Sequence, residues 1–503
     1  MMKWHIWENI CCGNMPSSSH SASCLTADKT GTASLSALTD KEKKSESSEV
    51  LINDILCSST SRYLITEFNG EGRFGKVTKG INLTTSQDVA LKMLKAESSA
   101  EREIKMLEVV SVLDPVKKNV VQFFEKFKHK GRTCLVFELL DRSLFQLFSE
   151  RHWKPLAFSE IRPIAQQLLM ALDALKGIGV IHSDLKPDNI MLANHLSEPF
   201  RVKLIDFGLS FTTSNKRCGM RVQPLGYRAP EVTLGLSIYE AIDMWGLGCV
   251  LSFLYLAKHL FAIHCEYQSM RGIIDILGQP ADHLLCAGRY THKFFKVNQH
   301  WNNQRWQIKT PREYQLGTGT EPKRWMSPFR NLQDLIKHKP EMQESIELED
   351  QRAFVSLLKS LLHTDPERRI TPEKALSHPF VTMAHLVDRI DTSLYVKDSL
   401  QKMLVCPMDD LDEALSPDGE AEEKPKGEKP TAIPHSVAGS AVPCSYDGVK
   451  NMPKSSDRAE GAAVIDASGS AVWDSTVSQG AASTAEGTSA YGGSPVESPP
   501  QAR

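Results

Sequence analysis

Two short polar segments constrain this chain more than any other feature. Residues 182–189 read His-Ser-Asp-Leu-Lys-Pro-Asp-Asn, and residues 206–208 read Asp-Phe-Gly. A lone Asp-Phe-Gly is usually an ordinary turn after a strand. The two segments together supply a carboxylate, a cation and hard oxygen ligands, which are the groups that phosphoryl transfer requires. The chain must therefore fold so that both segments meet at one site.

Phosphoryl-transfer chemistry gives four of these side chains a role. Asp184 would orient the acceptor hydroxyl and take its proton, and Lys186 would neutralise charge on the transferred group. Asn189 and Asp206 would bind Mg²⁺, which prefers carboxylate, carbonyl and phosphate oxygens. We therefore expect an enzyme that uses ATP and Mg²⁺.

A glycine-rich stretch lies upstream of these segments and contains Gly70, Gly72 and Gly75, followed by Val77. Dinucleotide-binding folds use the same spacing, but there a helix begins at the glycines. Here a strand pattern follows and leads to Val-Ala-Leu-Lys at residues 89–92, an order typical of protein kinases. The glycines would let the backbone approach phosphate, and Lys92 would contact the α- and β-phosphates.

A carboxylate on the following helix must hold Lys92 in place. Glu103 is the expected partner, because apolar residues follow it at core spacing and place it at the buried edge of the helix. Its separation from Lys92 is short compared with related kinases, so Glu101 and Glu108 stay open as alternatives. A solvated charge on an exposed helix face is the other interpretation of Glu103.

Hydrophobic periodicity predicts an α+β fold with two lobes. Alternating stretches predict five antiparallel strands at residues 63–68, 76–80, 89–94, 120–127 and 133–139, with one helix after the third strand. This first lobe would cover residues 63–140. Helical spacing dominates residues 141–380, and a helical extension is expected at 381–406.

Polar composition at both ends of the chain predicts disorder. Residues 1–54 are rich in Ser, Thr, Lys and Glu, and residues 407–503 are first acidic and then rich in Ser, Ala, Gly and Pro. Such segments cannot bury enough apolar surface to offset chain entropy. The tail contains Ser-Pro pairs at residues 416–417, 494–495 and 498–499. These pairs leave two alternatives open: the tail is a flexible interaction platform, or it is phosphorylated by the kinase itself.

Charge, cysteines and hydropathy narrow the functional classes. The formal charge of -2 argues against direct nucleic-acid binding, and the 11 cysteines lack the paired spacing of a zinc site or disulfide framework. Cysteines without such spacing favour a location of the protein in the nucleus or cytoplasm. Residues 244–263 are long and apolar enough to span a bilayer. Because Lys258 and His259 interrupt the run and Asp243 precedes it, we expect a buried helix and no membrane association.

Residues 63–406 resemble the homeodomain-interacting protein kinases, which are relatives of the dual-specificity tyrosine-regulated kinases in the CMGC group. The resemblance is carried by residues 134–140, 185–192, 227–231, 240–245, 370–372 and 378–383. It implies a bilobal eukaryotic protein kinase fold and a monomeric kinase domain. It also implies a serine/threonine kinase, often favouring proline after the acceptor, with nuclear transcription regulators among its protein substrates.

The same resemblance assigns further residues. The adenine pocket would be lined by Val77, Ala90, Phe137, Glu138, Leu139 and Met191. Glu231 would pair with Arg369, and Asp243 would bind the backbone of the catalytic loop. Arg228 occupies the position tied to proline preference, and Lys186 favours serine or threonine over tyrosine substrates.

The activation segment, which lies between Asp206-Phe207-Gly208 and Glu231, departs from the family pattern. Arg221 stands where family members carry an activating tyrosine, and Leu225 stands where an arginine would receive its phosphate. Ser183 stands where most kinases have an arginine that reads activation-loop phosphate, although this family commonly lacks that arginine. We hypothesise an enzyme that is active without activation-loop phosphorylation, or only weakly active. A pseudokinase scaffold is the other hypothesis, which the retention of Lys92 and Asp184 disfavours. The short C-terminal region gives no ground for homeodomain binding.

Overall fold

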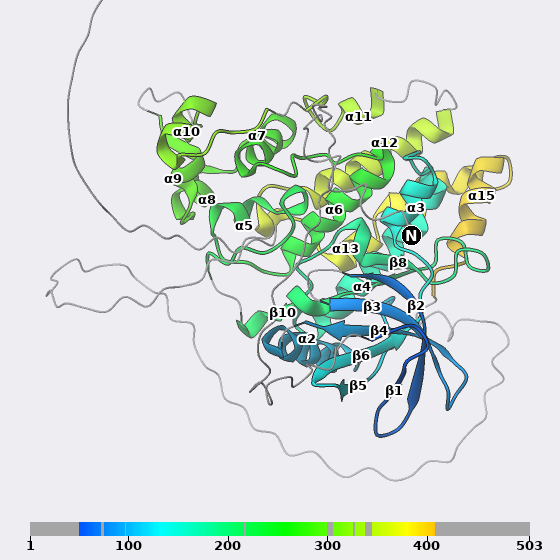
Figure 1. Cartoon of the computed structure of the whole chain (residues 1–503). Helices are drawn as coiled ribbons and strands as arrows, with labels where there is room; N and C mark the ends of the chain where they lie inside the picture. The colour runs from blue at the N-terminus through cyan, green and yellow to red at the C-terminus, as the bar shows by residue number, and fades with distance from the viewer. Residues whose placement is uncertain are drawn as a thin grey trace, which may run out of the picture. The chain divides into compact units, whose positions relative to one another are not determined.

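The computed structural model describes residues 50–71, 75–95, 97–215, 218–298, 305–324, 327–337 and 345–407. The described residues from Leu51 onward belong to one compact unit. Within this unit a β-rich lobe and a helical lobe lie next to each other, with the sheet below the helices in Figure 1. Of the ends predicted to be disordered, 1–54 and 407–503, residues 1–49 and 408–503 lie outside the described residues.

The β-rich lobe is a single antiparallel sheet with the strand order β1-β2-β3-β4-β6-β5. All five expected strands are present, and β1 extends the sheet at one edge. The helix α2 follows β4 and packs against it, with Met106, Leu107 and Val110 buried. The strands and helix are β1 (Ile55–Cys57), β2 (Arg62–Glu71), β3 (Gly75–Asn82), β4 (Asp88–Leu94), α2 (Glu97–Val110), β5 (Phe123–His129) and β6 (Arg132–Glu138).

The sheet also takes in residues that precede the expected start of the domain. The predicted disordered arm reached residue 54 and the domain was expected to begin at residue 63. Instead, Asn53 donates to the carbonyl of Ile65 at 2.9 Å, and the Ile65 amide donates to the carbonyl of Asp54 at 2.9 Å. The short strand β1 then pairs with β2. Backbone hydrogen bonds hold this segment although it contributes few buried side chains, so hydrophobic periodicity could not reveal it.

The second lobe is mainly helical and is built around two long helices, α4 (Phe158–Gly177) and α6 (Ala241–Leu256). Every residue of α6 from Ile242 to Leu256 is buried, which explains its membrane-like composition. Within the described residues no helix is both long and apolar enough to cross a membrane. The remaining helices are α3 (Leu144–Glu150), α5 (Pro230–Leu234), α7 (Glu266–Leu277), α8 (Asp282–Ala287), α9 (Thr291–Phe294), α10 (Pro311–Thr318), α11 (Asp334–Lys337), α12 (Ser345–Leu361), α13 (Pro372–Leu376), α14 (Pro379–Thr382) and α15 (Leu394–Met403).

Two small antiparallel pairs position the polar segments named above. The pair β8 (Ile190–Leu192) and β9 (Val202–Leu204) joins the end of the 182–189 loop to the residues before Asp206. The pair β7 (Val180–Ile181) and β10 (Phe211–Thr212) joins the start of that loop to the residues after Gly208. The fold therefore brings both segments to one place, as their chemistry requires. A third pair, β11 (Phe295–Val297) and β12 (Trp306–Ile308), lies farther along the chain.

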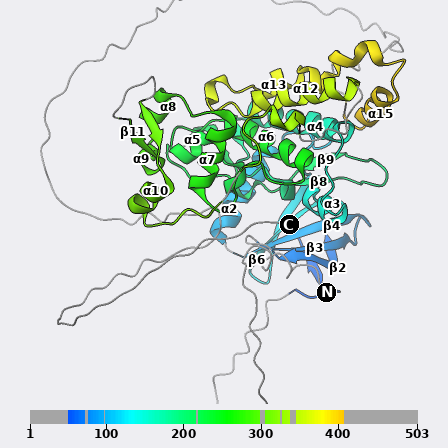
Figure 2. The ribbon, with the colours of Figure 1, turned by 90° about the horizontal axis from the view of Figure 1, so that it is seen from above.

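The residues after α14 form a 3₁₀ segment (Ala384–Arg389) and α15, which packs against α4. A buried ion pair joins Arg162 of α4 to Asp350 of α12, and His385 and Tyr395 of the extension bond to the same carboxylate. Figure 2 shows α15 next to α4 and α12. The predicted helical extension at 381–406 is thus part of the helical lobe's packing.

Candidate active site

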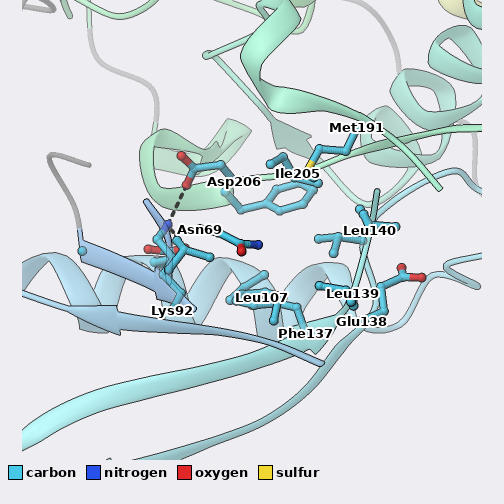
Figure 3. Close-up of a pocket in the computed structure, with 16 residues that line it drawn as sticks. Asn69, Lys92, Leu107, Phe137, Glu138, Leu139, Leu140, Met191, Ile205 and Asp206 are labelled. Atoms are coloured by element: carbon cyan, nitrogen blue, oxygen red, sulfur yellow. Dashed lines mark hydrogen bonds and ion pairs between the residues drawn. The ribbon is translucent and has the colours of Figure 1, made fainter. Parts of the chain in front are cut away.

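A pocket of about 240 Å³ lies between the two lobes (Figure 3). Its walls are largely apolar. Val77 and Ala90 come from the sheet, and Met191 and Ile205 come from β8 and the residues just after β9. Phe137, Glu138, Leu139 and Leu140 form the connection between the lobes. A flat apolar group could therefore enter between the lobes with its edge facing the connecting backbone.

Lys92 lies between two carboxylates at the inner end of this pocket. Its Nζ is 2.6 Å from Oε1 of Glu103 and 3.0 Å from Oδ1 of Asp206, and the Asp206 contact is the dashed line in Figure 3. The Glu103 side chain is only 3% exposed. Glu108 pairs instead with Lys126 on the surface, and Glu101 is exposed. Of the three candidate glutamates, the structure brings Glu103 to Lys92.

Burial and charge act in opposite directions on these groups. Burial disfavours the charged ammonium of Lys92, but Asp206 and Glu103 outweigh it and raise its pKa. Burial also works to raise the pKa of Asp206, yet the charge and hydrogen bond of Lys92 bring that pKa below its ordinary value. Asp206 therefore stays a carboxylate, which is the form that can bind a metal ion.

The catalytic loop groups its polar side chains around Asp184. Oδ2 of Asp184 accepts from Nζ of Lys186 at 3.0 Å and from Nδ2 of Asn189 at 2.7 Å. Asn189 also donates to the Asp184 carbonyl at 2.9 Å, so its Oδ1 is the atom that can face a cation. Burial raises the pKa of Asp184, and the neighbouring Lys186 opposes that rise. Among the described residues, both of these side-chain hydrogen bonds go to Oδ2 of Asp184 and not to Oδ1.

Asp243 braces the backbone of this loop, as the resemblance implied. Its carboxylate accepts from the amides of His182 at 2.7 Å and Ser183 at 2.8 Å. Ser183 has a positive φ of 63°, a conformation that is costly for a residue with a side chain. Its hydroxyl donates to the carbonyl of Leu209 at 2.8 Å. Ser183 therefore ties the catalytic loop to the residues after Gly208.

Glu138 lines the pocket, but its carboxylate is occupied elsewhere. Nζ of Lys203 lies 2.7 Å and 2.8 Å from its two oxygens, and the Gln122 amide donates to it at 2.7 Å. Lys203 is almost fully buried. Only the backbone of Glu138 therefore faces a ligand, while its side chain fixes the connection between the lobes.

The activation segment ends in a tightly bonded turn around Arg228. Gln223 has a φ of 67°, and its carbonyl accepts from Nε of Arg228 at 3.2 Å and from Nη2 at 3.0 Å. Nη1 of Arg228 lies 2.8 Å from Oε1 of Glu266 on α7. The Gln223 side chain is buried as well, and bonds to the Ile242 carbonyl and the Ala229 amide. This turn is therefore fixed by both side chains.

The expected ion pair between Glu231 and Arg369 is present and buried. Nη1 and Nη2 of Arg369 lie 2.6 Å and 3.0 Å from the two carboxylate oxygens of Glu231. Arg369 also donates to the carbonyls of His363 and Ala241. Its parallel bonds tie the activation segment to the distal helices.

The two departures from the family pattern have different surroundings. Nη1 of Arg221 lies 3.4 Å from Oε1 of Glu266, and its guanidinium lies 5.5 Å from the centre of the Tyr290 ring. Leu225 is half-buried at the start of a 3₁₀ turn (Leu225–Tyr227). Arg221 is thus held by Glu266 of α7, and Leu225 offers an apolar side chain where a second cation would stand.

Some pocket residues differ from the expected set. Gly75 lines the pocket, whereas Gly70 lies in β2 opposite Val77 and Gly72 lies outside the described residues. Sequence reasoning missed Asn69, Leu107, Val121, Leu140, Ile205 and Phe207. Asn69, Leu140, Ile205 and Phe207 adjoin predicted site residues, so adjacency could have found them. Leu107 and Val121 had only core-like patterns.

The donor set fits Mg²⁺ rather than a metal that the protein alone encloses. Within the described part of the chain, no group of three or more His, Cys, Asp and Glu side chains could hold a metal ion. Asp206 and Asn189 offer one carboxylate and one amide oxygen. Mg²⁺ is commonly bound by one or two carboxylates together with substrate phosphates and water, so this sparse set is suitable.

Comparison with known proteins agrees with this geometry. The model of the protein kinase domain matches residues 63–381. The chain therefore belongs to the protein kinase family. It is 40% identical to homeodomain-interacting protein kinase 1 of Mus musculus over 371 residues, which cover 71% of this chain and 30% of that protein. It is 37% identical to homeodomain-interacting protein kinase 4 of Macaca fascicularis over 362 residues, which cover 68% of this chain and 59% of that protein.

A nematode relative extends the same similarity. The chain is 37% identical to homeodomain-interacting protein kinase 1 of Caenorhabditis elegans over 407 residues, which cover 77% of this chain and 48% of that protein. The resemblance seen in the motifs is confirmed. The aligned region spans less than two thirds of each of these relatives.

Proposed function

We propose that this chain is an ATP-dependent protein serine/threonine kinase. One observation carries the proposal. Lys92, Glu103 and Asp206 meet in an apolar pocket, and Asp184, Lys186 and Asn189 are hydrogen-bonded to one another in the 182–189 loop. These are the cation, metal ligands and acceptor-orienting carboxylate that phosphoryl transfer requires.

The nucleotide would bind with its base in the apolar part of the pocket. Val77 and Ala90 would cover one face, and Met191 and Ile205 the other. Lys92, held by Glu103, would bind the α- and β-phosphates, and Gly75 would allow close approach of the backbone. Asp206 and Asn189 would hold Mg²⁺, which would neutralise phosphate charge.

The acceptor hydroxyl would be oriented by Asp184. Its Oδ2 is engaged by Lys186 and Asn189, so Oδ1 would receive the hydroxyl hydrogen as the oxygen attacks the γ-phosphorus and the bond to ADP breaks. Lys186 would also bind the transferred phosphoryl group. A lysine at this position supports serine or threonine as the acceptor.

Proline preference has a geometric basis in the activation segment. The Gln223 carbonyl accepts two hydrogen bonds from Arg228, so it points toward that guanidinium inside the turn. An ordinary residue after the acceptor would lose hydration of its N–H without finding this acceptor. Proline has no N–H to satisfy. We therefore propose proline-directed phosphorylation.

We further propose that activity does not depend on a phosphorylated activation-loop tyrosine. Arg221 occupies that position and contacts Glu266 and Tyr290, which supports an activation segment held without phosphate. A weakly active enzyme or a pseudokinase scaffold is the second candidate. The substitutions at Arg221 and Leu225 are the specific observation in its favour.

Substrate class and location follow from the relatives only as proposals. The names of the relatives describe kinases that interact with homeodomain proteins. We propose protein substrates that include transcription regulators, a monomeric kinase domain and a nuclear or cytoplasmic location. Direct binding to nucleic acid or membrane is not part of this proposal.

A positional peptide library tests the proposed function. The full chain is incubated with Mg-ATP and peptides that vary the acceptor among Ser, Thr and Tyr and the next residue among all amino acids. We expect transfer to Ser and Thr with proline selected at the next position. An Asp184→Asn variant that transfers phosphate at the wild-type rate would contradict the proposed chemistry.

A further inference from the structure

Positive side chains outnumber negative ones where the activation segment meets α7 and α9. Glu266 of α7 receives three cations: Arg221 and Arg228 contact the same oxygen, Oε1, and Lys293 of α9 contacts Oε2. Helix α7 contacts α5, in which the activation segment ends, and α8 and α9 lie near these helices in Figure 1. A single carboxylate therefore serves three positive groups.

Arg289 adds a further cation beside Tyr290. Its guanidinium lies 5.8 Å from the centre of the Tyr290 ring, against which Arg221 also lies at 5.5 Å. The Tyr290 hydroxyl donates to the Gly219 carbonyl at 3.2 Å. Arg289 itself is exposed. We call Arg221, Arg228, Arg289 and Lys293 the cation cluster.

The charge of the cation cluster is not balanced by Glu266. Burial works to raise the pKa of Glu266, but Lys293, Arg221 and Arg228 outweigh burial and lower it. Even a fully ionised Glu266 supplies one negative charge to the three cations that contact it. The Arg221 and Lys293 side chains are 30% and 27% exposed, so an incoming group can reach them. Such a surface favours an anion, and arginines bind carboxylates and phosphates through paired hydrogen bonds.

The cluster also lies where a substrate would pass. Arg228 belongs to it and at the same time occupies the Gln223 carbonyl, beside which the residue after the acceptor would lie. An extended peptide advances about 3.3 Å per residue. The next few residues of the substrate would therefore lie within reach of Arg221 and Arg289.

We propose that the cation cluster is a binding site for an acidic or phosphorylated side chain located two to four residues after the acceptor. The proposal rests on the proposed kinase function and adds a second specificity element to the proline pocket. Charge complementarity would act on substrate capture, and salt would weaken it.

Matched peptides provide the test. Three peptides share a Thr-Pro acceptor and carry Glu, Gln or phosphoserine at positions two to four after it, and kcat/KM is measured for the full chain at low and high salt. We expect Glu and phosphoserine to exceed Gln by about three- to tenfold at low salt. Arg221→Gln and Arg289→Gln should each reduce that ratio. Arg389→Gln removes an exposed arginine from the C-terminal extension and should preserve the ratio.

A binding measurement separates this proposal from the proposed function. The same peptides with alanine as the acceptor are titrated against each variant by fluorescence anisotropy. Tighter binding of the acidic peptides that requires Arg221 or Arg289 supports the site even if no phosphate is transferred. Equal affinity of the Glu, Gln and phosphoserine peptides for wild type would overturn it, as would an acidic preference that survives both arginine substitutions.

Discussion

The nucleotide pocket and the activation segment arrange charge in opposite ways. In the pocket one cation, Lys92, lies between the carboxylates of Glu103 and Asp206. In the activation segment one carboxylate, Glu266, lies among Arg221, Arg228 and Lys293. The first region has negative charge in excess and suits a metal ion. The second has positive charge in excess and suits an anion. The proposed phosphoryl transfer therefore depends on a region of excess negative charge, and its proposed control depends on a separate region of excess positive charge.

The largest effect is expected from the catalytic carboxylate. Asp184→Asn keeps the shape of the side chain but removes the group that orients and deprotonates the acceptor. We expect kcat to fall by about two to three orders of magnitude, as when one well-placed polar group is lost. ADP production with a Thr-Pro peptide measures the effect. Asp275→Asn on α7 is the matched control, and a drop of less than tenfold for Asp184→Asn would contradict the assigned role.

Removing one carboxylate from Lys92 tests the pocket side of the comparison. Glu103→Gln removes one of the two carboxylates that contact Lys92, and we expect kcat/KM for ATP to fall by about ten- to a hundredfold, the usual cost of a lost charged hydrogen bond. Glu108→Gln is the control, because Glu108 pairs with Lys126 at the surface. Equal losses in both variants would remove Glu103 from the proposed machinery.

Removing the carboxylate from the activation segment tests the other side. Glu266→Gln leaves Arg228 less firmly oriented, so the Gln223 carbonyl should become available to an ordinary backbone N–H. We expect the ratio of kcat/KM for Thr-Pro over Thr-Ala peptides to fall by about three- to tenfold. Glu313→Gln removes a carboxylate paired with Lys296 elsewhere. If both peptides slow equally in Glu266→Gln, the residue has only a structural role.

The smallest expected effect concerns pH. Burial raises the pKa of Asp184, and the reaction requires its carboxylate form. Activity should therefore fall, as the pH is lowered, at a higher pH than an ordinary aspartate with a pKa of about 3.9 would give. Because Lys186 lowers this pKa, Lys186→Met should move the acid limb of the kcat/KM profile to still higher pH. If the acid limb does not move in Lys186→Met, Lys186 does not lower the pKa of Asp184.

Local patterns predicted many residues of the pocket between the lobes, because these residues lie in short contiguous motifs. Core spacing after Glu103 was enough to choose it over Glu101 and Glu108, and the structure brings Glu103 to Lys92. The strand β1 escaped because it has only three residues, of which only Leu56 is buried, and so short a run shows no periodicity. The contact between Arg221 and Glu266 escaped for another reason. It joins segments far apart in the chain, and no local pattern marks it.

We propose that this kinase needs no phosphate on its activation segment. The most direct measurement is turnover of the full chain with Mg-ATP and a Thr-Pro peptide before and after complete phosphatase treatment, with mass spectrometry to verify removal and Asp184→Asn as the background. Because Arg221 already contacts Glu266 and Tyr290, the account predicts less than about a twofold change, within the energy of an exposed ion pair. Loss of activity to the Asp184→Asn background, with recovery only after rephosphorylation, would contradict it.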